Sequence, residues 1–351
     1  MTRHTAERAA WISAAAGLLV AFIAWIVAPE AFPHAWLAAI VCWIGWPLGS
    51  LALILIHALT GGRWGFAIRP QLVLGMTTLP LLLPAILPLL FVLHRLYPWL
   101  DPAVASGLDN GFYLNLPFLI ARGILYCVVW LGLGGIVLWS LRRADPEPIL
   151  YRVAAPGLIL LMLTVTFAAI DATLSLEPHF KSSIYGMLVA SEAVLFALSI
   201  AVLGTLLTAP PQTPVLHDFG RLMFALVVFW AYLDFMQVLI IWQSDLPHEA
   251  AWYTERIRGG WGVLAAIIAI LHFALPFFAL IWPQVQRSRR GLTSIAAILL
   301  AIQIPYAWWV VLPAAGRSLQ IADIAAMAAI LGAAIALSLR APALLAVRRH
   351  G

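Results

Sequence analysis

Ten apolar stretches, each long enough to cross a bilayer, constrain the fold of this chain of 351 residues more than any other feature. A helix of about 20 apolar residues spans the hydrocarbon core. A backbone in lipid must satisfy its own hydrogen bonds, so each stretch is expected to be helical. The sequence therefore predicts an all-α integral membrane protein in which residues 1–351 form a single transmembrane domain. The predicted spans are 10–28, 34–59, 70–93, 115–141, 153–175, 183–208, 218–243, 260–283, 291–313 and 320–340.

The composition excludes a soluble globular domain. Apolar residues make up 64% of the chain and charged residues only 10%, whereas soluble domains average about 45–50% and about 25%. Cys42 and Cys127 both lie in apolar runs, and the sequence has no CxxC or CxxCH motif. We therefore expect no covalently bound haem, iron–sulfur cluster or metal site on this chain. The net charge of +5 is interpreted as a topology signal, and no nucleic-acid partner is expected.

The basic residues predict how the chain is oriented. Cytoplasmic loops of membrane proteins are rich in Lys and Arg. With the N-terminus in the cytoplasm, 14 of the 20 basic residues fall in inner segments and five in outer segments, and Arg122 lies inside the fourth span. This distribution predicts a multi-pass protein of the bacterial inner membrane with both termini in the cytoplasm. The first apolar stretch has no clean small-residue cleavage site after it, so it is interpreted as a retained helix.

The two longest connections, 94–114 and 244–259, fall on the predicted outer side together with most of the loop carboxylates. They are candidates for docking a periplasmic partner, and simple solvated loops are the alternative interpretation.

Three carboxylates lie inside predicted spans, where an ionisable side chain costs a few kcal/mol and is a functional hypothesis by default. Asp171, Glu192 and Asp234 occupy three successive spans and share the predicted outer half of the membrane. Carboxylates in such surroundings can take up and release protons. The alternative is that each one only pairs with an arginine or a carbonyl to hold helices together. Arg122, inside the fourth span, is the expected ion-pair partner for one of them.

Other polar residues extend this candidate proton pathway. His272 lies at mid-membrane and is a candidate relay, and His57 lies near the predicted inner end of the second span. Thr164, Asp171 and Ser175 are spaced by seven and four residues, which predicts one polar helix face. A haem held by the two histidines is disfavoured because they lie at different depths.

Several separate motifs resemble one family of membrane subunits in the same order over roughly residues 45–285. The most specific runs from Ala155-Pro156-Gly157 to Tyr185-Gly186, through Thr164-Val165-Thr166 and Asp171. The others are 57–65, 113–118, 217–220, 229–242, 246–253, 259–261 and 272–277. In these motifs the chain resembles the F subunit of bacterial alternative complex III, an NrfD-like (polysulfide-reductase-type) membrane protein. Asp234 departs from the family pattern, which has a small or hydroxyl residue there, and the ninth span lacks the charged residues expected.

The resemblance implies two four-helix bundles, spans 2–5 and 6–9, with flanking helices. It further implies a quinone-site-like bundle and part of a proton route without a redox metal, in a quinol:cytochrome c oxidoreductase. The implied partners are a paralogous NrfD-like quinol-binding membrane subunit, a periplasmic iron–sulfur subunit, c-type cytochrome subunits, a terminal oxidase and lipids. The iron–sulfur clusters and haem c are expected on those partners, and quinol at or near this chain. The residues expected near a quinone are Glu177, His179, Tyr185 and Gln237.

Two other functions stay open from the sequence. The chain is a non-catalytic membrane anchor for a periplasmic electron-transfer or dehydrogenase complex if its polar residues only pack helices and dock partners. A secondary transporter is disfavoured, because no pair of Gly- or Pro-broken spans is evident at matching positions of two inverted halves.

Overall fold

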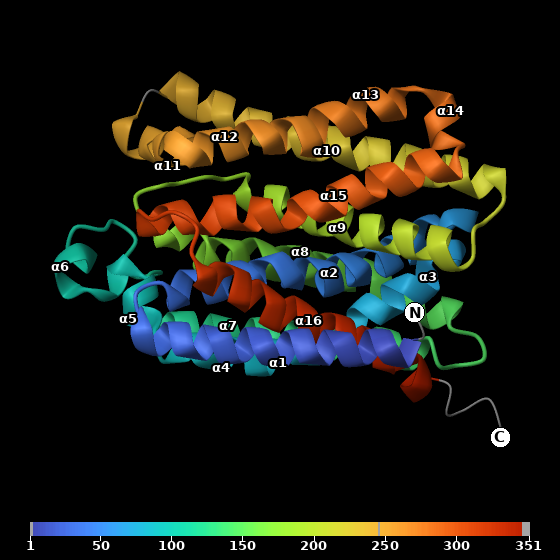
Figure 1. Cartoon of the computed structure of the whole chain (residues 1–351), viewed down its shortest axis with the longest axis horizontal. Helices are drawn as coiled ribbons and strands as arrows, with labels where there is room; N and C mark the ends of the chain where they lie inside the picture. Colours follow the sequence, from blue (N-terminus) through green and yellow to red (C-terminus); the bar gives the residue numbers. More distant parts are fainter. Residues whose placement is uncertain (1–2, 245, 346–351) are drawn as a thin grey trace.

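Ten apolar helices, several of them interrupted or extended by short turns, run along one common direction (Figure 1). The computed structural model describes residues 3–244 and 246–345, and within them it contains helices and no strand. The predictions of an all-α protein and of ten membrane-length apolar helices are thus confirmed. The spans are α1 (Arg3–Val27), α2 (Phe32–Thr60), α3 with α4 (Arg63–Leu90), α7 (Leu116–Ser140), α8 (Glu147–Ala172), α9 (Tyr185–Thr208), α10 (Thr213–Ser244), α12 with α13 (Gly259–Ile281), α15 (Arg289–Val311) and α16 (Ile321–Leu345).

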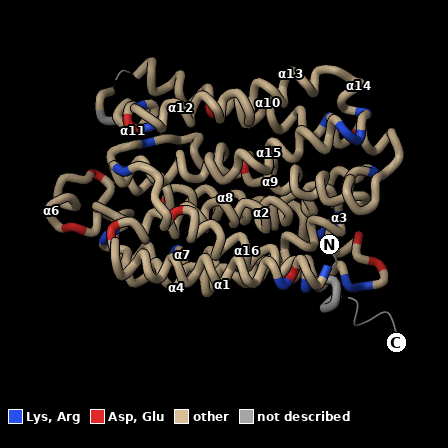
Figure 2. The backbone as a smooth tube through the Cα atoms, in the orientation of Figure 1, with Lys and Arg blue, Asp and Glu red and all other residues tan. Residues whose placement is uncertain are grey.

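The molecule has two polar ends and an apolar middle. In Figure 2 the charged residues gather at the two ends of the helices, and few interrupt the middle. One end carries the short helices α5 (Leu93–Leu96), α6 (Pro102–Ala105) and α11 (Pro247–Ile257), and the other carries α14 (Pro283–Gln286) (Figure 1). The first and last described helices meet at the α14 end, where the Arg3 Nε donates to the Leu339 carbonyl (2.7 Å).

The centre of the molecule is α2, which is buried along most of its length and packs against α8, α9, α15 and α16. Its approach to α9 is close because Gly49 faces the backbone of Ala193, where a Cβ would collide. Small residues let helices in lipid approach in this way. A glycine also allows α1 and α16 to pack closely, because Gly17 faces the backbone of Ala325 and Ala329.

The third and eighth spans are irregular. The third is interrupted between α3 (Arg63–Met76) and α4 (Leu82–Leu90) by the 3₁₀ turn η1 (Leu79–Leu81), which contains Pro80. The eighth contains a π-helical segment, η4 (Ala269–Ala274), shortly before Pro276. Proline removes a backbone donor and clashes with the preceding turn, which favours such irregularities. If the chain is divided into two halves of five spans each, the third and the eighth spans are both the third span of their half. This differs from the expectation that no pair of Gly- or Pro-broken spans lies at matching positions.

Candidate functional site

A cavity of about 730 Å³ lies among α2, α4, α7, α8, α9 and α15. Its walls are mostly apolar, with aliphatic and aromatic side chains. The cavity reaches the molecular surface at Leu87 and Leu90 of α4 and at Ile124 and Val128 of α7, all at least half exposed. Ile124 and Val128 lie well inside the span Leu116–Ser140, where exposed aliphatic side chains face lipid, so the cavity is open sideways toward the bilayer.

The inner wall of the cavity is polar. Side chains from α7, α8, α9 and α15 present oxygen or nitrogen atoms there, and each is more than nine-tenths buried. They fall into two groups, one around Asp171 at the end of α8 and one around Glu192 on α9. The polar residues used below are Tyr126, Asp171, Tyr185, Glu192, Gln303 and Tyr306.

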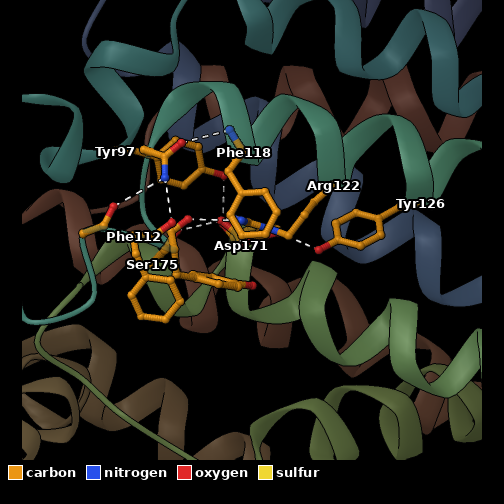
Figure 3. Close-up of polar contacts among 11 residues, drawn as sticks. Tyr97, Phe112, Phe118, Arg122, Tyr126, Asp171 and Ser175 are labelled. Atoms are coloured by element: carbon orange, nitrogen blue, oxygen red, sulfur yellow. Dashed lines mark hydrogen bonds and ion pairs between the residues drawn. The ribbon is translucent and has the colours of Figure 1, made fainter.

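The Asp171 cluster consists of Arg122, Tyr126 and Asp171 (Figure 3). The Nε and Nη2 of Arg122 donate to the two carboxylate oxygens of Asp171, both at 2.8 Å, and the Tyr126 hydroxyl adds a third bond at 2.7 Å. The guanidinium also donates to the Tyr113 carbonyl (3.0 Å) and lies 3.8 Å from the Tyr113 ring centroid. Bidentate pairing of this kind is the strongest and most directional ion pair available to a carboxylate. The ion pair expected for Arg122 is therefore present, and every charged atom of the cluster has a partner.

The Glu192 cluster has the opposite character. It consists of Glu192 on α9, Trp230 on α10, His272 on η4, and Gln303 and Tyr306 on α15. The Glu192 Oε2 lies 3.2 Å from the His272 Nε2, but their orientation does not make a hydrogen bond. Among the described residues, neither oxygen of Glu192, neither ring nitrogen of His272 nor the Gln303 Oε1 has a hydrogen-bond partner of normal geometry. Buried polar atoms are nearly always bonded, so such a concentration of exceptions points to a functional site.

Aromatic rings hold the imidazole of this cluster in place. The ring of His272 is stacked on Trp230, with centroids 4.1 Å apart and an interplanar angle of 14°. Tyr306 meets the same ring edge-on at 5.7 Å. The π-helical segment η4 carries His272, and such segments are frequent at functional sites. Asp234 on α10 lies within electrostatic range of Glu192, so two of the three predicted carboxylates share one neighbourhood.

The remaining residues of the predicted proton pathway have local partners. His57 donates through Nε2 to the Gly62 carbonyl (2.9 Å) and accepts from Arg69 (3.3 Å), near the other end of the molecule. The Thr164 hydroxyl accepts from Trp130 (2.9 Å) and donates to a carbonyl of its own helix. Because α8 ends at Ala172, Ser175 lies in the following turn η3 (Leu174–Leu176) and not on a continued helix face. The Ser175 hydroxyl nevertheless donates to the Asp171 carbonyl (2.6 Å), so the turn keeps Ser175 beside Asp171.

Of the four residues expected near a quinone, only Tyr185 borders the cavity, but Glu177 lies within electrostatic range of Tyr185, and Gln237 bonds to Tyr253, which also interacts with Tyr185. Tyr185 borders the cavity and shares a hydrogen bond of 2.7 Å with the Thr173 hydroxyl. The other three do not border the cavity. Glu177 pairs with Arg256, His179 lines a polar hollow at the α6 end of the molecule, and Gln237 bridges Ser182 and Tyr253.

Sequence reasoning missed two members of these contacts. Tyr126 follows Arg122 by four residues, a spacing that places both on one helix face and was a usable signal. Arg256 lies in the 244–259 connection, which the sequence offered as a docking surface or a solvated loop, but its side chain is 0% exposed, 2.7 Å from Glu177 and 3.7 Å from the Trp252 ring centroid. Burial lowers the pKa of Arg256 from its ordinary value, and the neighbouring Glu177 opposes that effect.

No group of three or more His, Cys, Asp or Glu side chains suited to a metal ion occurs in residues 3–244 and 246–345. The chain matches no protein-family model and no curated protein sequence. The geometry of the cavity and its two polar clusters therefore carries the functional argument.

Proposed function

We propose that this chain is an integral subunit of a quinol-oxidising electron-transfer complex in the bacterial inner membrane, and that its cavity binds the quinol. The observation that supports this most directly is the cavity itself. Its volume of about 730 Å³ falls in the range of sites for small organic ligands. Its aliphatic walls open toward lipid and suit an isoprenoid tail, whereas its polar inner wall suits a ring that carries two oxygens.

The arrangement of the helices agrees with the NrfD-like resemblance. The cavity lies mainly within the second to fifth spans, and the partners of Glu192 come from the seventh, eighth and ninth. We interpret these as two four-helix bundles that meet along α2 and α9. Partner subunits would supply the iron–sulfur clusters and haem c, and the excess of basic residues in the loops on the side of the termini supports a cytoplasmic location for both termini.

The rival functions have less support. A pure anchor requires neither a lipid-facing cavity nor unpartnered polar groups at its end. A transporter with paired broken spans would present free backbone or side-chain groups at both breaks. At the third span, however, Thr78 accepts from Trp43 (3.1 Å) and donates to the Gly75 carbonyl (2.8 Å), so its hydroxyl is already used.

A tryptophan placed in the cavity tests the proposal. Gly123 borders the cavity, and a Cβ there would meet no atom within 4 Å, so Gly123→Trp should fill the space without moving the backbone. Gly132 of the same helix has equal room but lies outside the cavity, so Gly132→Trp is the matched control. After purification with its partners in mild detergent, wild-type protein and the control should retain bound quinone. Gly123→Trp should lose it, and quinol oxidation should fall about tenfold or more. Equal quinone content in the two variants, or none in the wild type, would contradict the proposal.

The two cysteines provide a second test without altering the cavity. Cys127 borders the cavity and is half-buried, whereas Cys42 is fully buried. A lipid-soluble maleimide should modify Cys127 first, and an excess of a short-tailed ubiquinone should slow that reaction. Cys127→Ala identifies the labelled position. Labelling that is insensitive to quinone would count against a ligand in this cavity.

A further inference from the structure

Glu192 lies between the cavity and His272. Its side chain borders the cavity, and its Oε2 is 3.2 Å from the Nε2 of His272. His272 is 1% exposed and does not border the cavity. A ligand at the inner wall therefore reaches His272 by way of the Glu192 carboxylate.

We propose that Glu192 accepts the protons that leave the quinol and passes them to His272, a step that rests on the proposed function. Oxidation of a quinol breaks two O–H bonds and releases two protons and two electrons. The electrons go one at a time to an iron–sulfur or haem acceptor on a partner subunit. Each proton forms an O–H bond on the Glu192 carboxylate and is transferred to the Nε2 of His272, and the imidazolium releases its Nδ1 proton to water. A tautomer exchange, in which Nε2 loses its proton and Nδ1 regains one, restores the Nε2 lone pair before the second proton arrives. The carboxylate is then free to accept the second proton.

Two carboxylates border the cavity, Asp171 and Glu192, and their different contacts favour Glu192 as the proton acceptor. A proton on Asp171 would replace a bond from Arg122 or Tyr126 and leave the guanidinium buried without its counter-charge. Removing one partner of a buried ion pair in this way is strongly unfavourable. A proton on Glu192 breaks no ion pair with a fixed cation and no hydrogen bond of normal geometry, although the Gln303 side chain lies close enough to interact with the carboxylate.

The groups around Glu192 agree with this assignment. The titratable side chains that face it are Cys42 on α2, Asp234 on α10, His272 on η4 and Tyr306 on α15. None of them carries a fixed positive charge. A carboxylate without a fixed cation beside it can alternate between its charged and neutral forms, which a proton acceptor must do.

Glu192→Gln tests the step because the amide has the shape of the carboxyl group but cannot take up a proton. The full chain, loaded with a short-tailed ubiquinone, is cycled electrochemically while infrared difference spectra are recorded. The wild type should show a carboxylic-acid C=O band that changes with the redox state of the quinone, and Glu192→Gln should lack it. Quinol oxidation by the purified complex should fall about 100-fold with bound quinone retained. Glu147→Gln, far from the cavity at the other end of α8, is the matched control and should keep both band and rate.

The outcomes separate this step from the proposed function. If Glu192→Gln retains quinone, band and rate, the proton step is overturned and the cavity proposal stands. If only this variant loses bound quinone, Glu192 is a binding group and the proton step is again overturned. A wild type that binds no quinone overturns both.

His272→Phe tests the transfer from Glu192. The phenyl ring can keep the stacking on Trp230 but cannot accept a proton. The infrared band of Glu192 should persist in this variant while quinol oxidation slows about tenfold or more. An undiminished rate would overturn the assignment of His272 as the next acceptor.

Discussion

Asp171 and Glu192 border the same cavity from neighbouring helices, and they are equally buried, at 4% and 5% exposure. Asp171 accepts three hydrogen bonds, two of them from an arginine that lies under an aromatic ring. Glu192 has no hydrogen bond of normal geometry to a described residue, lies close to the Gln303 side chain, and is 3.2 Å from an imidazole that also lacks a hydrogen bond of normal geometry. A carboxylate in a membrane is costly in either case. Around Asp171 the protein offsets that cost with an ion pair, and around Glu192 it leaves polar atoms available to a ligand or a proton.

The largest expected effect on stability comes from breaking the ion pair of the Asp171 cluster. Arg122→Leu leaves Asp171 buried without its counter-charge and should lower the free energy of unfolding by about 3–5 kcal/mol. The double variant Arg122→Leu/Asp171→Leu removes both charges and should recover most of that loss. Unfolding in mixed detergent–SDS micelles measures both values.

An exposed ion pair provides the control for this experiment. Arg95 and Glu30 are 3.7 Å apart with side chains 45% and 80% exposed. Arg95→Leu should change stability by less than about 1 kcal/mol. If Arg122→Leu costs no more than this control, the Asp171 cluster does not hold helices together and the contrast with Glu192 is lost.

The sequence predicted the fold well for a physical reason. The length and apolar character of a span are set by the bilayer, so ten spans were countable without tertiary information. Irregular turns inside spans depend on neighbouring helices as well as on proline. The break before η1 uses Trp43, whose indole donates to Thr78 from a residue 35 positions away.

The candidate site was predicted only as a set of residue types. The sequence singled out Asp171 and Glu192 equally, because burial alone makes each of them costly. The two differ in that Asp171 has an arginine beside it. Arg122 is 49 residues from Asp171 along the chain but 2.8 Å away in space. Arg256 shows the same limit, since nothing local indicates that its loop helix folds back and stacks Trp252 on Phe180 (4.9 Å). Partners of this kind come from tertiary packing, which a single sequence does not display.

A smaller effect is expected from replacing Trp230, the ring that stacks on His272 in the Glu192 cluster. Trp230→Phe keeps a ring beside His272 and should cost about 1 kcal/mol of stability. Trp230→Leu removes the stack and should leave the imidazole free to rotate away from Glu192. The pH profile of quinol oxidation should then shift for Trp230→Leu and stay close to wild type for Trp230→Phe. An equal shift in both variants would indicate that stacking does not position His272.

The smallest effect on stability should come from the residue with the largest effect on rate. Glu192→Gln removes a buried charge that has no fixed cation beside it and no hydrogen bond of normal geometry to a described residue, and the amide can keep the contacts with His272 and Gln303. A neutral amide is also less costly to bury than a carboxylate. The free energy of unfolding should therefore stay within about 1 kcal/mol of the wild type or rise. Unfolding in mixed detergent–SDS micelles, measured side by side for Glu192→Gln and Arg122→Leu, compares the two free energies of unfolding. If Glu192→Gln destabilises the protein as much as the loss of Arg122 does, then Glu192 holds helices together. The two carboxylates would in that case have the same role, because a residue kept free for proton transfer contributes little to stability.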